Sequence, residues 1–173
     1  SADLEIILDV GCGGGVNIER FLKMTENRVC GIDYSELSVE RSVDLNSQAI
    51  GEGRCEIIQA SVSDLPFEDN SFDIVTAFET VYFWPDFTND LVEIRRVLKD
   101  DGILFIANEA LPNENDKRQK HIIELLEMKI YSRDELEESL KIAGFKNIKS
   151  FVKQSKDSFS SDDAMWICVN ATR

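Results

Sequence analysis

The stretch Ile6–Gly15, which reads Ile-Ile-Leu-Asp-Val-Gly-Cys-Gly-Gly-Gly, decides the fold of this 173-residue chain. Its first half is apolar and rich in branched side chains, as is typical of a parallel strand covered on both faces. A glycine-rich turn follows, and such a turn at the start of a helix brings backbone N–H groups close to a ligand. The stretch therefore predicts a buried strand, a ligand-binding turn and a helix.

A second acid, Asp33, follows a second short apolar segment at 28–32. In doubly wound sheets an acid at this spacing accepts ribose hydroxyls, so the pattern predicts a nucleoside-containing cofactor. The dinucleotide fingerprint G-x-G-x-x-G does not fit, because Val16 stands where its third glycine belongs. Asp9, just before the turn, is an unfavourable neighbour for a phosphate and favours a ligand with a positive amino group.

Strand-like and helix-like segments alternate along the whole chain, which predicts an α/β, Rossmann-like doubly wound sheet that is mostly parallel. We predict strands at residues 5–10, 28–32, 55–59, 72–78, 103–108, 147–153 and 164–171. One helix follows the glycines, and we predict others at 36–50, 87–99 and 116–128. A further helix is opened by the capping-box pattern Ser132–Glu135, and Ser35 is the expected cap of the second helix.

The composition of the chain disfavours several classes of partner and binding site. The chain has 33 acids and 19 bases, a net charge of −14, which disfavours a nucleic-acid partner. We interpret its basic cluster Lys117–Lys120 as a solvated helix face. Four cysteines without a C-x-x-C pair and one histidine, His121, predict no metal site. A signal peptide and a membrane-length apolar run are both missing from the sequence, so we expect a reduced, cytoplasmic protein with no membrane partner, and leave its oligomeric state open.

Four stretches resemble, in order, the class I S-adenosylmethionine (SAM)-dependent methyltransferases. Leu8–Gly15 resembles their first motif and Gly31–Ser35 their second; Ser61–Asp73 resembles the stretch D-A-x-x-L-P-F-x-D-x-S-F-D, and Val92–Gly102 resembles the helix before their fifth strand. The nearest likeness is to small-molecule methyltransferases of the ubiquinone/menaquinone-biosynthesis type. The resemblance implies SAM as the cofactor and an antiparallel hairpin, formed by the last two strands, at the sheet edge.

The resemblance also implies a binding site. Glycines in the turn approach the methionine part of SAM, Asp9 meets its amino group and Asp33 accepts both ribose hydroxyls. The family usually has an acid that bonds the adenine amino group where this chain has Ser61, a weaker acceptor. The predicted cofactor-binding residues are Asp9, Gly11, Cys12, Gly13, Gly15, Asp33, Tyr34, Ser61, Val62 and Phe78.

Methyl transfer depends mainly on alignment, and a base is needed only where the acceptor loses a proton. The segment Glu79–Pro85 carries the candidates, and we predict Glu79 and Tyr82 as catalytic residues. Relatives often have histidines where Tyr82 and Phe83 stand, so we expect no histidine-based proton transfer. Tyr82 and Trp84 either form an aromatic acceptor pocket, suited also to a cationic amine, or pack at a strand–helix junction.

Our leading hypothesis is a SAM-dependent methyltransferase acting on a small-molecule acceptor. A nicotinamide-dependent oxidoreductase shares the fold and Asp33, but Val16 and Leu65–Phe67 speak against it. A non-catalytic SAM-binding partner or regulatory protein is the alternative that Ser61 keeps open. We expect residues 1–173 to form a single SAM-binding domain, and to lack the N-terminal lid helices of the family because the first predicted strand starts near residue 1.

Overall fold

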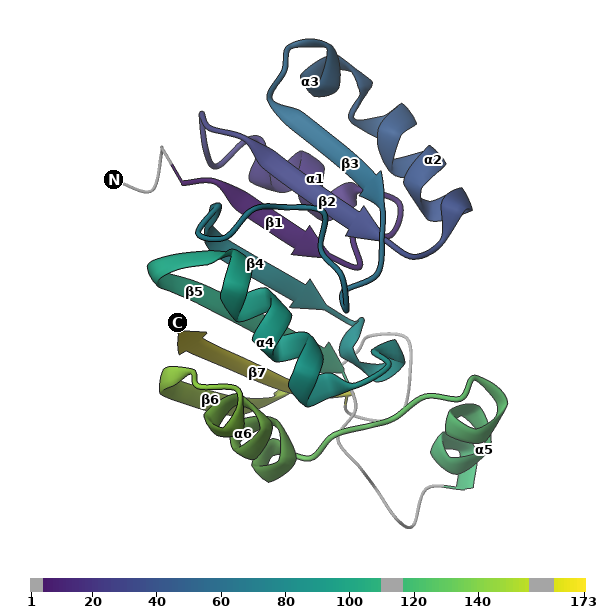
Figure 1. Cartoon of the computed structure of the whole chain (residues 1–173). Helices are drawn as coiled ribbons and strands as arrows, with labels where there is room; N and C mark the ends of the chain where they lie inside the picture. Colours follow the sequence, from purple (N-terminus) through teal and green to yellow (C-terminus); the bar gives the residue numbers. More distant parts are fainter. Residues whose placement is uncertain (1–4, 110–116, 156–163) are drawn as a thin grey trace.

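The computed structural model describes residues 5–109, 117–155 and 164–173. In these residues the order of the strands across the sheet is β3-β2-β1-β4-β5-β7-β6 (Figure 1). Strands β1 to β5 pair in parallel, and β7 runs antiparallel between β5 and β6. The strands are β1 Ile7–Val10, β2 Val29–Asp33, β3 Cys55–Gln59, β4 Phe72–Phe78, β5 Leu98–Glu109, β6 Lys146–Ser155 and β7 Ala164–Thr172. The predicted fold and its antiparallel edge pair are therefore confirmed.

Helices cover both faces of this sheet. Figure 1 shows α4 and α6 in front of the strands and α1 behind them. The helices are α1 Val16–Phe21, α2 Glu36–Leu45, α3 Ser47–Gly51, α4 Phe87–Val97, α5 Lys117–Leu125 and α6 Arg133–Ile142, with a short 3-10 turn, η2, at Val81–Phe83. Leu8 and Val10 of β1 are buried towards α4 and α6, whereas Ile7 is buried with Ile18 of α1. This alternation is why the first strand reads as an unbroken apolar run.

The predicted helix starts are confirmed by side-chain caps. The Ser35 hydroxyl accepts the N–H of Ser38 at the start of α2, and Ser132 and Glu135 form a capping box at the start of α6. Two predicted boundaries are wrong. The second helix breaks at Asn46 into α2 and α3, and β5 begins at Leu98 rather than 103. β5 passes through Asp101, whose φ is +63°, in the left-handed region. We predicted a turn before residue 103, whereas the strand continues through it.

On the α1 side, the part of the sheet formed by β4, β5 and β7 carries a hollow of about 410 Å³. Aromatic and aliphatic side chains line it, among them Phe21, Ile74, Phe78 and Phe105. Phe105 is exposed, as is Phe151 on β6. This face matters for the site, because it holds the side chain of Phe78, which we predicted to contact the cofactor.

Candidate functional site

A crevice of about 680 Å³ opens where β1, β2 and β4 end. Ligands of doubly wound sheets bind at this edge, beside the point where the strand order reverses. Here β1 lies between β2 and β4, so the reversal falls at the glycine turn. Seven of the predicted site residues line the crevice: Gly11, Gly13, Asp33, Tyr34, Ser61, Val62 and Glu79.

Backbone conformation explains why glycine is needed at positions 11 and 13. Gly11 and Gly13 have φ values of +72° and +54°, in the left-handed region that favours glycine. A Cβ on Gly11 would lie 2.1 Å from Oγ1 of Thr80, whereas a Cβ on Gly13 would meet nothing within 4 Å. Gly11 therefore lets the end of β4 approach the turn, and Gly13 keeps one side of the crevice open.

The Asp33 carboxylate joins the two motifs. Its Oδ2 accepts the N–H of Gly13 at 2.8 Å, and its Oδ1 accepts the N–H of Ser35 at 2.9 Å. A carboxylate has about four lone-pair sites, so two are left for a ligand. The carboxylate is therefore held in place before any ribose arrives.

Gly15 and Cys12, both predicted to bind the cofactor, do not line the crevice. A Cβ on Gly15 would lie 2.3 Å from Oγ of Ser42 and 2.6 Å from Nδ2 of Asn46, so this glycine lets α1 approach α2. The Cys12 thiol is buried near Ser42 and Gly31, and burial holds its pKa above the ordinary value. The structure gives both residues packing roles beneath the turn.

Asp9 also lies beneath the turn. It is 2% exposed, and its Oδ1 accepts a 2.7 Å hydrogen bond from the hydroxyl of Thr76 on β4. Burial raises the pKa of Asp9 to about 7, against the lowering effect of the Thr76 bond, and the Asp33 charge raises it further. We did not predict Thr76; its signal in the sequence was a hydroxyl inside the apolar run Ile74–Phe78.

Tyr34, Ser61 and Val62, the residues predicted to hold an adenine, also line the crevice. The Ser61 hydroxyl accepts the N–H of Ser63 at 3.2 Å, which fixes its orientation. Tyr34 is 83% exposed, so its ring is available to a planar ligand. All three residues line the crevice, and their contact with a cofactor stays a prediction.

Glu79 and Tyr82 lie close together but face different spaces. Glu79 lines the crevice, has a left-handed φ of +56°, and accepts the N–H of Glu109. The Tyr82 hydroxyl donates to the carbonyl oxygen of Glu109 at 2.5 Å and lies 3.4 Å from both Glu79 carboxylate oxygens. Burial raises the pKa values of both side chains. Glu79 is therefore the member of the pair with access to a ligand.

Phe83, Trp84 and Pro85 complete the crevice and form an aromatic wall. The prediction named Trp84 as a possible pocket residue and did not include Phe83. Phe78 belongs to the opposite face, where its ring packs against Phe21 at a centroid distance of 6.3 Å. The prediction that Phe78 contacts the cofactor finds no support in this geometry, because successive side chains of a strand point to opposite faces.

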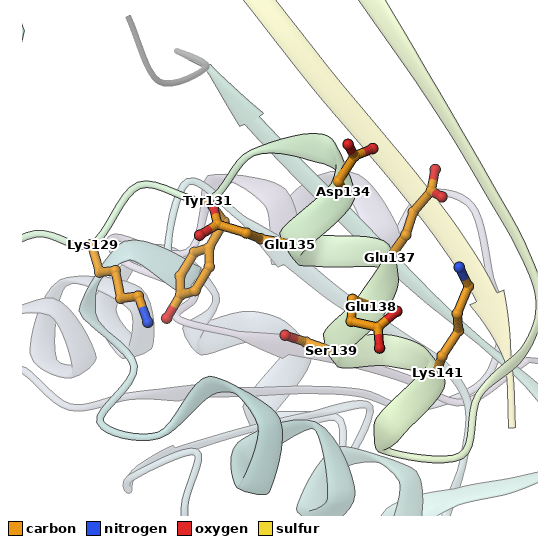
Figure 2. A pocket seen from close by; sticks show the side chains of 8 residues that line it. All are labelled: Lys129, Tyr131, Asp134, Glu135, Glu137, Glu138, Ser139 and Lys141. Carbon is orange, nitrogen blue, oxygen red and sulfur yellow. The ribbon is translucent and has the colours of Figure 1, made fainter. Parts of the chain in front are cut away.

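A second hollow, of about 530 Å³, lies along α6. Figure 2 shows Lys129 and Tyr131 with the Glu135 side chain reaching towards Tyr131, and Asp134, Glu137, Glu138 and Lys141 further along α6. None of its lining residues lines the crevice. In the described part of the chain, no group of three or more acidic, cysteine or histidine side chains is arranged to hold a metal ion. The same residues contain no helix with the length and apolarity needed to cross a membrane.

A family model described as a methyltransferase domain matches residues 8–106. The chain belongs to this family. The match runs from the first strand through the glycine turn, the crevice and α4 to β5, and it confirms the predicted class I SAM-dependent methyltransferase family.

Individual relatives agree with the family. Cycloartenol-C-24-methyltransferase 1 of Oryza sativa subsp. japonica is 34% identical over 125 residues, which are 69% of this chain and 36% of that protein. The O-methyltransferase cnsE of Penicillium expansum is 32% identical over 146 residues, 83% of this chain and 53% of that protein. The chain thus spans about a third to a half of the length of these relatives.

Among solved structures, the Haemonchus contortus phosphoethanolamine N-methyltransferase 2 complex with phosphomonomethylethanolamine and S-adenosylhomocysteine superposes with a TM-score of 0.87. The superposition covers 100% of this chain and 49% of the Haemonchus contortus chain, and the two sequences are 17% identical. At this identity the likeness shows the fold alone.

Proposed function

We propose that this chain binds SAM in the crevice and transfers its methyl group to a small-molecule acceptor. One observation supports this most: Asp33, held by the Gly13 and Ser35 N–H groups, faces the crevice beside an open glycine turn. The crevice is large enough for a nucleoside with a short side chain. Its lining also fits the cofactor chemically, with a carboxylate for hydroxyl groups and an exposed aromatic ring for a purine.

Each end of the cofactor has a candidate partner. We assign the ribose hydroxyls to Asp33 and the adenine to Tyr34, Ser61 and Val62, which line the crevice. The assignment of the amino group to Asp9, which is buried beneath the turn, rests on the family resemblance. Bound SAM supplies an electrophilic methyl group on a positively charged sulfur. The chain contributes alignment, because reacting groups held in place avoid the entropic cost of a bimolecular encounter.

We propose Glu79 as the general base where the acceptor must lose a proton. Its carboxylate lines the crevice, and its raised pKa makes it a better proton acceptor than an ordinary glutamate. We assign Tyr82 a positioning role instead, because its proton is already donated to the Glu109 carbonyl oxygen. This revises our prediction that Tyr82 is catalytic.

We propose an acceptor that is uncharged and partly apolar. Phe83, Trp84 and Pro85 present an aromatic and aliphatic wall, and no described lysine or arginine lines the crevice to hold an anion. The rice relative, named for methylation of cycloartenol at C-24, has an acceptor of this chemistry.

Because the four cysteines are free thiols, we also infer a reducing, cytoplasmic location.

Isothermal titration with S-adenosylhomocysteine tests the proposal, with NAD as the matched nucleotide control. We expect binding of S-adenosylhomocysteine alone, weakened in Asp33→Ala. Binding of NAD in its place would overturn the cofactor assignment. A methyl-donor turnover assay with apolar alcohols as acceptors then separates an enzyme from a non-catalytic SAM-binding protein, since only the enzyme forms a methylated product.

A further inference from the structure

Asp90 is a buried carboxylate outside the crevice lining. It lies in the first turn of α4 and is 1% exposed. Its Oδ1 accepts the hydroxyl of Ser63 at 2.6 Å, and its Oδ2 accepts the N–H of Asp86 at 3.0 Å. Among the described residues, no lysine or arginine forms an ion pair with it. A buried charge is costly unless it is hydrogen-bonded, so this carboxylate depends on its two donors.

The first donor belongs to the residues 60–65 that follow β3, which we call the adenine loop. While its hydroxyl donates to Asp90, the Ser63 N–H donates to the hydroxyl of Ser61 at 3.2 Å. Ser61 lines the crevice, so the carboxylate reaches the lining through a single intervening residue. The position of the Ser61 hydroxyl therefore depends on Asp90.

The second donor belongs to the segment that carries the aromatic wall. Asp86 comes directly after Pro85, which lines the crevice together with Trp84. The Trp84 ring packs against Phe87, the first residue of α4, with 5.6 Å between the ring centroids. The wall therefore leads into α4 through a backbone N–H whose acceptor is the Asp90 carboxylate.

We propose that Asp90 is a positioning residue that holds the adenine loop and the aromatic wall at a fixed separation, and so sets the width of the crevice between cofactor and acceptor. The inference rests on the proposed function, because it takes SAM as the ligand beside the adenine loop. A hydrophobic side chain needs no hydrogen bonds and would fill this place at a smaller cost in free energy. The carboxylate adds a link to each segment, through Ser63 and through Asp86.

Four variants separate the links. Asp90→Ala removes both, and Ser63→Ala removes only the link to the adenine loop. Asp90→Asn is the conservative variant, because an amide can accept the Asp86 N–H and donate to the Ser63 hydroxyl oxygen. Glu93→Ala is the matched control: Glu93 lies three residues further along α4 and accepts the N–H of Leu65 at 2.9 Å, and neither residue lines the crevice.

Titration calorimetry with S-adenosylhomocysteine measures the effect on the adenine loop. We expect the affinity to fall about tenfold in Asp90→Ala and about threefold in Ser63→Ala, and to return close to the parent value in Asp90→Asn. A mere loss of folded protein would lower the fitted stoichiometry and leave the affinity unchanged. Where Asp90→Ala does not fold, Ser63→Ala decides the link to the loop, and unchanged affinity in that variant would overturn it.

Fluorescence of Trp84 measures the effect on the aromatic wall, in a Trp166→Phe background that leaves it as the only tryptophan. Trp84 is 7% exposed, so acrylamide should quench it poorly in the parent. We expect the quenching constant to rise about twofold in Asp90→Ala, because the wall opens locally once its anchor is lost. Ser63→Ala, Asp90→Asn and Glu93→Ala should keep the parent value.

The outcomes distinguish this inference from the proposed function. A folded Asp90→Ala protein with the parent's affinity and quenching would overturn the inference and leave the proposed function standing. Equal effects of Asp90→Ala and Glu93→Ala on both measurements would also overturn it, since Asp90 would then act only on stability. Absence of S-adenosylhomocysteine binding in the parent would overturn both.

Discussion

The two sides of the crevice are built differently. On the cofactor side, Gly13 and Asp33 are 20 residues apart and bonded directly through one backbone N–H. On the aromatic side, Tyr82 is tied to Glu109, 27 residues along the chain, and its own carbonyl accepts the N–H of Lys129. The glycine turn and Asp33 on the cofactor side are therefore positioned by one βαβ unit, whereas the aromatic side needs three separate segments to be folded.

The two sides differ in how firmly they are held before a ligand binds. The cofactor side has its hydrogen bonds made within the turn and needs little rearrangement to bind. The aromatic side depends on the segment after β4, on the end of β5 and on the residues before α6. Changes on the first side should affect fold and cofactor affinity, and changes on the second should affect acceptor turnover.

The largest effect should come from Gly15→Ala, which attacks the packing under the cofactor side. Its Cβ would lie 2.3 Å from Oγ of Ser42, at a φ of +84°. We expect the free energy of unfolding to fall by about 2–4 kcal/mol, from overlap and backbone strain together. Gly13→Ala is the matched control, since its Cβ would meet open space. Urea denaturation compares them, and equal losses would refute the packing role of Gly15.

Asp33→Ala should have the second largest effect, and this effect should be a loss of affinity for the cofactor. It removes the ribose acceptor and the anchor of the Gly13 N–H, so we expect the binding free energy of S-adenosylhomocysteine to weaken by about 1–3 kcal/mol. Asp64→Ala, which removes an exposed acid outside the crevice lining, is the charge-matched control. Calorimetry measures both, and unchanged affinity in Asp33→Ala would rule out the ribose assignment.

The sequence predicted the cofactor side well because its determinants are local. The apolar run, the glycines and Asp33 lie in one stretch, and each acts through its own backbone or a near neighbour. Gly15 was misjudged for a related reason: its motif position suggests ligand contact, while its partners Ser42 and Asn46 become visible only once α1 and α2 are packed.

The aromatic side was less accessible to prediction. Nothing in the sequence near Tyr82 indicates that its hydroxyl donates to Glu109, because that contact depends on the register between β4 and β5. Phe78 was misplaced because it ends β4, and one residue decides which face of a strand a side chain occupies. Patterns of residue type do not determine such side-chain orientations at a strand end.

Asp9→Asn should change the pH dependence of stability. Because the pKa of Asp9 in the folded protein is about 7, above its ordinary value of 3.8, the folded state binds more protons than the unfolded state between these values. The free energy of unfolding of the parent protein should therefore fall as pH rises to 7. Asparagine does not titrate, so its free energy of unfolding lacks this pH dependence. The free energy of unfolding of Asp9→Asn minus that of the parent protein should therefore rise by about 2 kcal/mol between pH 5.5 and 8. Thermal unfolding at the two pH values measures it; a constant difference would contradict the raised pKa.

Tyr82→Phe tests whether the two sides are independent. It removes the hydrogen bond to the Glu109 carbonyl oxygen, which should lower the free energy of unfolding by about 1 kcal/mol. We expect lower methyl-transfer turnover with unchanged affinity for S-adenosylhomocysteine. A loss of affinity as large as that of Asp33→Ala would show that the sides are coupled.

Ser61→Asp should have the smallest effect, and on the cofactor side it should strengthen binding rather than weaken it. The Ser61 hydroxyl accepts the Ser63 N–H, and Ser61 lines the crevice where we propose that the adenine binds. A carboxylate at this position can keep that bond and accept a second one more strongly, so we expect S-adenosylhomocysteine to bind more tightly by about 0.5–1 kcal/mol. The inosine analogue, with a carbonyl oxygen in place of the adenine amino group, should show no gain, because two oxygen acceptors then face each other. Equal gains for both ligands would mean that position 61 contacts some other part of the nucleoside.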